Sequence, residues 1–163
     1  MDNFTKQLEL GKKGENIVID YLNEKFEEVV DVSDDKKYQD MDVDFLCYKH
    51  NNKGEYKEFK VELKTDYRMD KTGNLFFELS HERKTGTYKG FFYKSQADFL
   101  LNLNANTNKL YVVPFRHKWR TLAYEQCRKV RFWNKWDDCY SNGMVISIEK
   151  AKELGIICTV VQL

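Results

Sequence analysis

Three charged residues in the first half of the chain have the types and spacing that metal-assisted phosphodiester hydrolysis requires. Residues 61–66, VELKTD, alternate apolar and charged side chains, so Glu62 and Lys64 are predicted to point to one face of a strand, about 6–7 Å apart. Asp44 opens an earlier apolar run, DVDFLCY. Carboxylates can hold Mg²⁺ and leave room for water and a phosphate oxygen, while a nearby ammonium contacts either group. The alternative is an ion pair on a solvated strand face, which an E-x-K triplet forms easily in a chain that is 33% charged.

The elements around these residues must bring Asp44 and Glu62 together. A first helix is predicted over residues 5–25, followed by a short edge strand at 29–32 and a longer strand at 42–48. The segment 50–54 turns the chain, and residues 58–64 return as the antiparallel partner. This hairpin would place the start of one strand beside the end of the other. A strand at 75–79 is expected to continue the meander.

The second half of the chain predicts further helices and strands. Ser95 is a plausible N-cap for a short helix over 97–103, and residues 109–114 read as a strand followed by a helix over 116–128. Ser147 would cap a helix over 148–154, Gly155 would end it, and residues 156–161 are β-rich. The predicted fold is one α/β domain over residues 1–163. Its central mixed sheet begins as an antiparallel meander and is flanked by helices.

The order of these residues along the chain, and the helix and strands predicted around them, resemble the PD-(D/E)XK nuclease superfamily, the restriction-endonuclease-like phosphodiesterases. That family has a Glu on a first helix, an Asp that opens a strand, and E-x-K at the end of the next strand. Here Glu15 lies in GKKGENIVIDYL, Asp44 in DVDFLCY, and Glu62 with Lys64 in VELKTD. A looser likeness covers GFFYKSQADFLLNL, which is similar to the segment after the core hairpin in some phage-type members.

The resemblance implies a Mg²⁺- or Mn²⁺-dependent DNA endonuclease with a restriction-endonuclease-like core, phage-encoded and acting on duplex or branched DNA. Asp44 and Glu62 would hold the metal. Glu15 would bind the metal directly or through water. The alternative is that it is a first-turn helix carboxylate that interacts favourably with the helix dipole. Lys64 would act as a base if its pKa falls and as an electrostatic clamp if it does not. The family's Pro is absent, and Asp42 shares a face with Asp44, so either aspartate can be the ligand. Asp44 is preferred because the apolar run follows it directly.

Candidate nucleic-acid contacts lie after the hairpin. They are Lys94, Gln96, Arg116, Lys118 and Arg120. Residues 115–136 also mix basic side chains with aromatic ones, which can stack on unpaired bases or can be core. Concerted cleavage of both strands would need two sites, so we expect a homodimer.

Charge and cysteine content restrict the other classes of function. The net charge is +1, so no bulk attraction to nucleic acid or membrane follows from it. The four cysteines lack zinc-ligand spacing and are expected to be small core residues in a reducing bacterial or phage-infected cytoplasm. No membrane span is expected. The alternative function is a catalytically silent module on the same fold that binds nucleic acid or a protein, such as a phage-encoded inhibitor of a host system.

Overall fold

A computed structural model describes residues 3–135 and 138–163. In that part of the chain six strands form a mixed sheet in the order β1-β2-β3-β6-β7-β10. They are β1 (Glu28–Asp31), β2 (Phe45–His50), β3 (Tyr56–Asp66), β6 (Phe99–Asn104), β7 (Lys109–Pro114) and β10 (Thr159–Gln162). Neighbouring strands are antiparallel, except that β3 and β6 are parallel. The predicted central mixed sheet that begins as an antiparallel meander is therefore confirmed.

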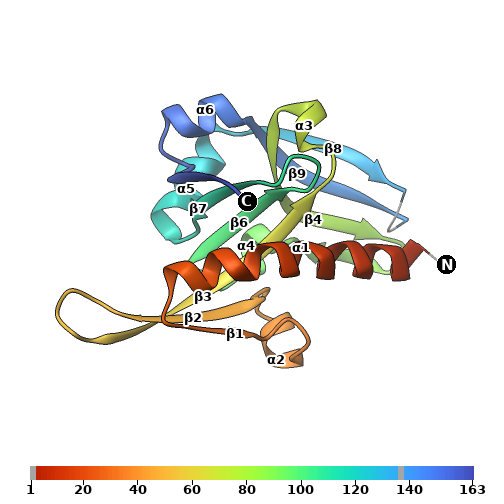
Figure 1. The fold of residues 1–163 in the computed structure, drawn as a ribbon. Coiled ribbons are helices and arrows are strands. Elements are labelled where there is room, and N and C mark those ends of the chain that lie inside the picture. The colour runs from red at the N-terminus through yellow and green to blue at the C-terminus, as the bar shows by residue number, and fades with distance from the viewer. Residues whose placement is uncertain (1–2, 136–137) are drawn as a thin grey trace.

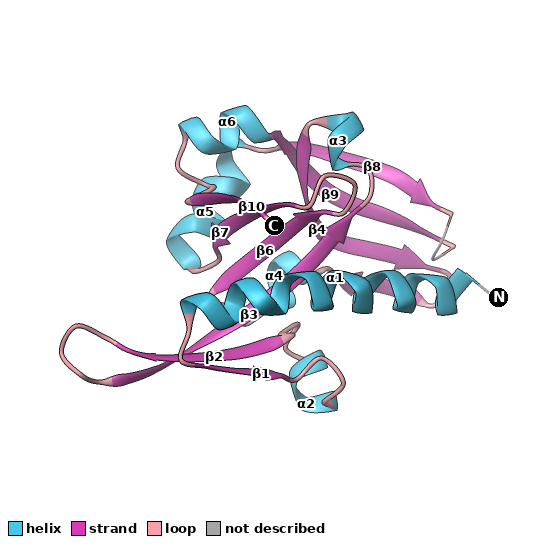
Figure 2. Ribbon diagram, in the orientation of Figure 1, coloured by secondary structure: helices cyan, strands magenta, loops and turns pink. Residues whose placement is uncertain are grey.

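A second sheet, of four antiparallel strands within the described residues, has the order β5-β4-β9-β8. Its strands are β4 (Asn74–Arg83), β5 (Gly86–Lys89), β8 (Arg128–Asn134) and β9 (Cys139–Ser147). The helices are α1 (Asn3–Lys25), α2 (Lys36–Gln39), α3 (Met69–Thr72), α4 (Phe91–Lys94), α5 (His117–Gln126) and α6 (Ile148–Glu153). In Figure 1 the long helix α1 passes in front of the strands, and Figure 2 shows helices placed around both sheets.

The two faces of the six-stranded sheet bury different cores, because successive side chains of a strand point to opposite faces. On one face Val18 and Leu22 of α1 pack with Val61 and Leu63 of β3. On the other face Leu100 joins a larger cluster that includes residues of α4, α5, α6 and the second sheet. The central strands β3 and β6 thus lie between two packed layers.

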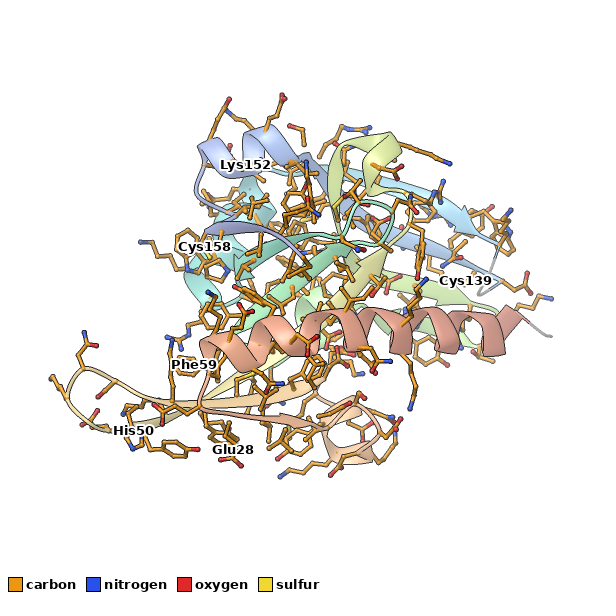
Figure 3. The ribbon with its side chains drawn as sticks, in the orientation of Figure 1. Glu28, His50, Phe59, Cys139, Lys152 and Cys158 are labelled. Carbon is orange, nitrogen blue, oxygen red and sulfur yellow. The ribbon has the colours of Figure 1, made fainter. Side chains whose placement is uncertain are left out.

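The β2–β3 hairpin sets the register on which the site depends. Phe45 pairs with Val61, and His50 pairs with Tyr56 at the far end. The turn is closed by Asn51, whose side-chain oxygen accepts from the backbone N–H of Lys53 at 2.9 Å. The tip of the hairpin extends away from the rest of the molecule, with His50 labelled near its end (Figures 1 and 3).

Two predictions about the elements are wrong. Residues 97–103 are not a helix, because residues 99–104 form β6, a buried strand whose near-continuous apolar run cannot be told from a short buried helix by periodicity. The strand predicted at 75–79 exists within β4, but it belongs to the second sheet and β6 takes the expected place beside β3. The first helix, the hairpin, the strand at 109–114, and the last helix with its Ser147 cap are confirmed.

Candidate active site

Asp44 lies beside Glu62 at the end of the β2–β3 ladder. The last pair of the ladder is Phe45 with Val61, and Asp44 and Glu62 are the next residues outward on the two strands. The Asp44 N–H donates to the Val61 carbonyl at 2.9 Å, and its Oδ2 accepts from the N–H of Leu63 at 2.7 Å. Opposed residues of an antiparallel pair share a face. The predicted juxtaposition of the two carboxylates is therefore present.

Glu62 and Lys64 point to the same face and contact each other. The Lys64 ammonium forms an ion pair with Oε1 of Glu62 and lies 5.0 Å from the ring centroid of Phe91. Glu62 is 2% exposed, and its second oxygen, Oε2, is buried without a hydrogen-bond partner among the described residues. The glutamate thus has one oxygen held by the lysine and one left for another ligand.

Asp42 has a left-handed backbone conformation, with φ of 47°, which aspartate tolerates better than most residues, and its charge acts on both Glu62 and Lys64. Its Oδ1 lies 3.2 Å from Nζ of Lys94, and its carbonyl accepts from Oγ of Ser95 at 3.0 Å. Its Oδ2 is buried and has no partner within the part of the chain described. Asp42 and Asp44 both remain candidate ligands, and the end of α4 fixes Asp42.

The charges of this cluster shift one another's pKa. Burial raises the pKa of Asp44, against the opposing effect of Lys64 and the N–H of Leu63. Burial also raises the pKa of Glu62, again opposed by Lys64. Burial lowers the pKa of Lys64, but the charges of Glu62 and Asp44 outweigh it and the net shift is upward.

The upward pKa shifts of Glu62 and Lys64 oppose each other, because a neutral Glu62 would no longer stabilise the charged form of the lysine. The close ammonium contact on Oε1 and the second negative charge of Asp44 favour the ionic pair at neutral pH. Lys64 is therefore an ammonium ion in this arrangement. Of the two roles left open by the sequence, this favours the electrostatic clamp over the base.

Glu15 approaches the cluster from α1. Gly14 lets the helix come close to β3, because a Cβ there would collide with Oγ1 of Thr65 and lie 3.2 Å from its Cβ. Gly14 thus allows a close approach of α1 to the Thr65 side chain of β3. The carboxylate of Glu15 accepts from Ser33 Oγ at 3.5 Å, and its charge raises the pKa of Asp44.

The donor set of the site suits a hard divalent cation with few protein ligands. Within residues 3–135 and 138–163, no group of three or more His, Cys, Asp and Glu side chains has the geometry to hold a metal. Mg²⁺ commonly keeps several waters and takes only one or two carboxylates plus substrate phosphate. Glu62 Oε2 and Asp42 Oδ2 are buried oxygen acceptors without partners. Glu62 together with one of the two aspartates, Asp44 or Asp42, therefore fits such an ion, whereas Glu15 lies with Ser33.

The predicted nucleic-acid contacts fall into two places. Lys94 and Gln96 lie beside the cluster, since Lys94 contacts Asp42 and the N–H of Gln96 donates to the Met41 carbonyl at 2.8 Å. The other three are at the start of α5: Arg116 pairs with Asp98 at 3.0 Å, and the exposed Lys118 ammonium lies 5.8 Å from the Trp119 ring centroid.

Arg120 differs from those neighbours in its surroundings. Its guanidinium donates to three backbone carbonyls, those of Phe92, Ser95 and Phe115, and lies 4.0 Å from the Phe115 ring centroid. Its donors are thereby used in joining α5 to the end of α4 and to the residue that follows β7. A structural role for Arg120 follows from this bonding.

The aromatic residues of segment 115–136 divide between core and surface. Phe115 is buried and Trp119 is half-buried. Tyr124, Phe132 and Trp133 are exposed. Trp136 lies outside the described residues. The two alternatives for this segment, core and exposed stacking surface, thus each apply to some of its members.

Sequence reasoning missed three residues next to the site: Phe91, Ser95 and Asn102. Phe91 lies under the Lys64 ammonium, and Ser95 binds the Asp42 carbonyl. Asn102 is paired with Lys64 across β3 and β6. In a strand, the sequence FLLNLN places two asparagines at alternate positions, so both point to the same face. This pattern indicates a polar site, but it is not recognised when the segment is predicted to be a helix.

The expectation that the four cysteines are core residues is confirmed for three of them and is wrong for Cys158, which is exposed. All four cysteines are free; Cys47, Cys127 and Cys139 are buried and Cys158 is exposed. Cys139 and Cys158 lie on opposite sides of the molecule in Figure 3. Among the described helices, none is long and apolar enough to cross a membrane.

Comparisons with known proteins give little further information. No family model matches the sequence, and no curated protein matches it. Among solved structures, the chain is similar to a bacterial homing endonuclease, I-Ssp6803I, with a TM-score of 0.46 and 17% identity. The match covers 64% of this chain and 66% of that chain, so this chain spans less than two thirds of its length. A likeness of this extent leaves the chemistry to be argued from the residues of the site.

Proposed function

We propose that the chain is a metal-dependent DNA endonuclease of the PD-(D/E)XK type. The observation that carries the proposal is the convergence of Asp44, Glu62 and Lys64 on one face of the β2–β3 ladder, with Glu62 Oε2 left as a buried, unpartnered acceptor. An unsatisfied buried oxygen costs about 1–3 kcal/mol, so a fold that keeps one beside a second carboxylate is expected to gain from a cation there.

Asp44 and Glu62 would hold Mg²⁺ or Mn²⁺, with Asp42 as the alternative to Asp44. Such an ion polarises a phosphate oxygen and lowers the pKa of bound water. The chain's own residues would do the rest. The Lys64 ammonium, held by Glu62 and by the Phe91 ring, would neutralise charge that develops on the phosphate and orient the attacking water. Lys94 would lie at the edge of the site as a phosphate contact.

Cleavage assays test the proposal. The purified protein is incubated with plasmid, linear, single-stranded and four-way-junction DNA, in Mg²⁺, Mn²⁺ or EDTA. We expect cleavage that EDTA abolishes, and that Glu62→Gln and Lys64→Ala each reduce about 10²- to 10³-fold or more, as for removal of a charge-stabilising group. Lys57→Ala is the matched control, because Lys57 is an exposed lysine of the same strand that pairs with Glu55. Its rate should equal that of the wild type.

The opposite result would support the alternative function. If no substrate is cleaved in either metal, while DNA binds equally well with EDTA and after Lys64→Ala, the chain is a binding module. Full metal-dependent cleavage by both Glu62→Gln and Lys64→Ala would show that the chemistry lies elsewhere. Sedimentation of the active form tests the homodimer that we propose for double-strand cleavage.

A further inference from the structure

Asn102 of β6 is a buried amide directly beside Lys64. The parallel ladder pairs Lys64 with Asn102, and the antiparallel ladder on the other side pairs Asn102 with Tyr111. Paired residues of neighbouring strands share a face, so the amide lies on the face that carries Glu62 and Lys64. Asn102 is 3% exposed, and its Nδ2 has no hydrogen-bond partner among the described residues.

Two residues along the same strand, Asn104 has a conventional structural role. It is equally buried, at 3% exposure, and points to the same face. Its Oδ1 accepts from the backbone N–H of Asn106 at 3.2 Å, which holds the turn between β6 and β7. Asn104 therefore shows how a buried asparagine on this strand can serve the fold, whereas Nδ2 of Asn102 is left without a partner among the described residues.

The unpartnered atoms belong to residues around the Glu62–Lys64 pair. Within the described part of the chain, the buried side-chain nitrogen and oxygen atoms without partners are Asp42 Oδ2, Glu62 Oε2 and Asn102 Nδ2. The charge of Asp42 acts on both Glu62 and Lys64, so the aspartate belongs to the same cluster. Each such atom costs about 1–3 kcal/mol when nothing binds it. Their coincidence indicates a ligand that satisfies all of them together.

The chemistry of the three atoms specifies that ligand. Two are carboxylate oxygens, which accept a hydrogen bond or bind a cation, and one is an amide nitrogen, whose N–H can only donate a hydrogen bond. A cation would satisfy the oxygens but not the amide. A phosphodiester bound beside a cation offers what is missing, an anionic oxygen that accepts a hydrogen bond. A neutral amide next to the Lys64 ammonium adds this donor without burying another charge.

We propose that Asn102 is a substrate-binding residue whose Nδ2 donates to a non-bridging oxygen of the scissile phosphate. The inference rests on the proposed nuclease function and adds a residue that the sequence motif does not contain. Together with Lys64 it would give the phosphate two donors from adjacent strands. Because the strands are in fixed register, both donors would be in place before the substrate binds.

The test compares Asn102→Leu, which keeps the shape of the side chain without its polar atoms, with Asn104→Leu as the control. Loss of Nδ2 removes no hydrogen bond from the fold, so Asn102→Leu should lose less stability in urea unfolding than Asn104→Leu does. Its kcat should fall about 10²- to 10³-fold, while KM changes less than about tenfold. Asn104→Leu should show the reverse pattern: it unfolds earlier, because the Asn106 N–H loses its acceptor, and it cleaves normally.

Each outcome has one meaning. If the wild type cleaves and Asn102→Leu cleaves with a kcat within about threefold of it, the inference is wrong and the nuclease stands. If the wild type cleaves nothing, the proposed function fails and this inference fails with it. Should Asn102→Leu not fold, Asn102→Ala replaces it, since it has no N–H donor and adds no charge, and the same criteria apply.

Discussion

A methyl group at Gly14 tests whether α1 is fixed to the site strand as described. At an ordinary helix position, Gly→Ala stabilises a protein by about 1 kcal/mol. Here the added Cβ would collide with Oγ1 of Thr65, and it would lie 3.3 Å from Cγ2, so rotation of the threonine only exchanges one clash for another. Overpacking of this kind costs about 1–3 kcal/mol. We therefore expect Gly14→Ala to destabilise by up to about 2 kcal/mol.

The partner substitution makes the prediction specific. In the Thr65→Ala background only Cβ remains, 3.2 Å from the new methyl, so most of the collision is removed and the helix preference of alanine returns. A double-mutant cycle should then give a coupling of about 1–3 kcal/mol in favour of the double variant. The assay is urea unfolding with a common m-value, and Asn16→Ala, at an exposed position of the same helix, is the control. A Gly14→Ala protein more stable than wild type by about 1 kcal/mol would refute the close approach of α1 to β3.

Three further predictions concern metal, pH and the role of α5. Mg²⁺ at ten times its dissociation constant should stabilise the protein by about 1.4 kcal/mol, or roughly 3–6 °C, in a thermal scan; an equal shift in Glu62→Gln would contradict metal binding there. Hydrogen bonds from the backbone N–H and the ring of His50 lower the pKa of Glu27 from 4.5. Glu27→Gln should therefore lower the free energy of unfolding by its full amount above pH 4.5, and the difference from the wild type should vanish as the pH falls through the folded-state pKa. Urea titrations at several pH values measure this difference. Arg120→Lys should lower the unfolding free energy by about 1–3 kcal/mol, because backbone carbonyls lose their donor. Lys118→Ala should leave stability unchanged and, if Lys118 binds a phosphate, reduce the salt slope of DNA binding by about 1.

Local sequence patterns predicted the elements nearest the site. The elements that pair with strands distant in the sequence could not be predicted in this way. The alternation around Glu62 and the turn through Asn51 belong to one hairpin, so their register followed from sequence neighbours. The neighbour of β3 on its other side is β6, about forty residues later, and no local signal encodes that pairing. Because β6 is buried on both faces, its apolar run also fits a helix, and the error concealed Asn102.

The second sheet was not predicted for a related reason. Its strands lie before β6 and after β7 in the chain, and the residues paired between β4 and β9 are 58 to 73 positions apart. Edge strand β8 is largely exposed and carries Arg128, Lys129 and Arg131, so it lacks the apolar alternation of a half-buried strand. Propensity alone could not place these strands.

The parallel pairing of β3 with β6 also bears on the order in which the site forms during folding. Residues 51–55 close the β2–β3 hairpin, whereas residues 67–98 must be closed before β6 can pair with β3. The longer loop adds about 1.5 kcal/mol of closure entropy, and contacts distant in sequence form slowly. Asp44, Glu62 and Lys64 would thus be neighbours in an early hairpin, while Asn102 joins them late. A chain still folding would hold the carboxylates without the complete phosphate site, which would delay the onset of cleavage until the sheet is finished.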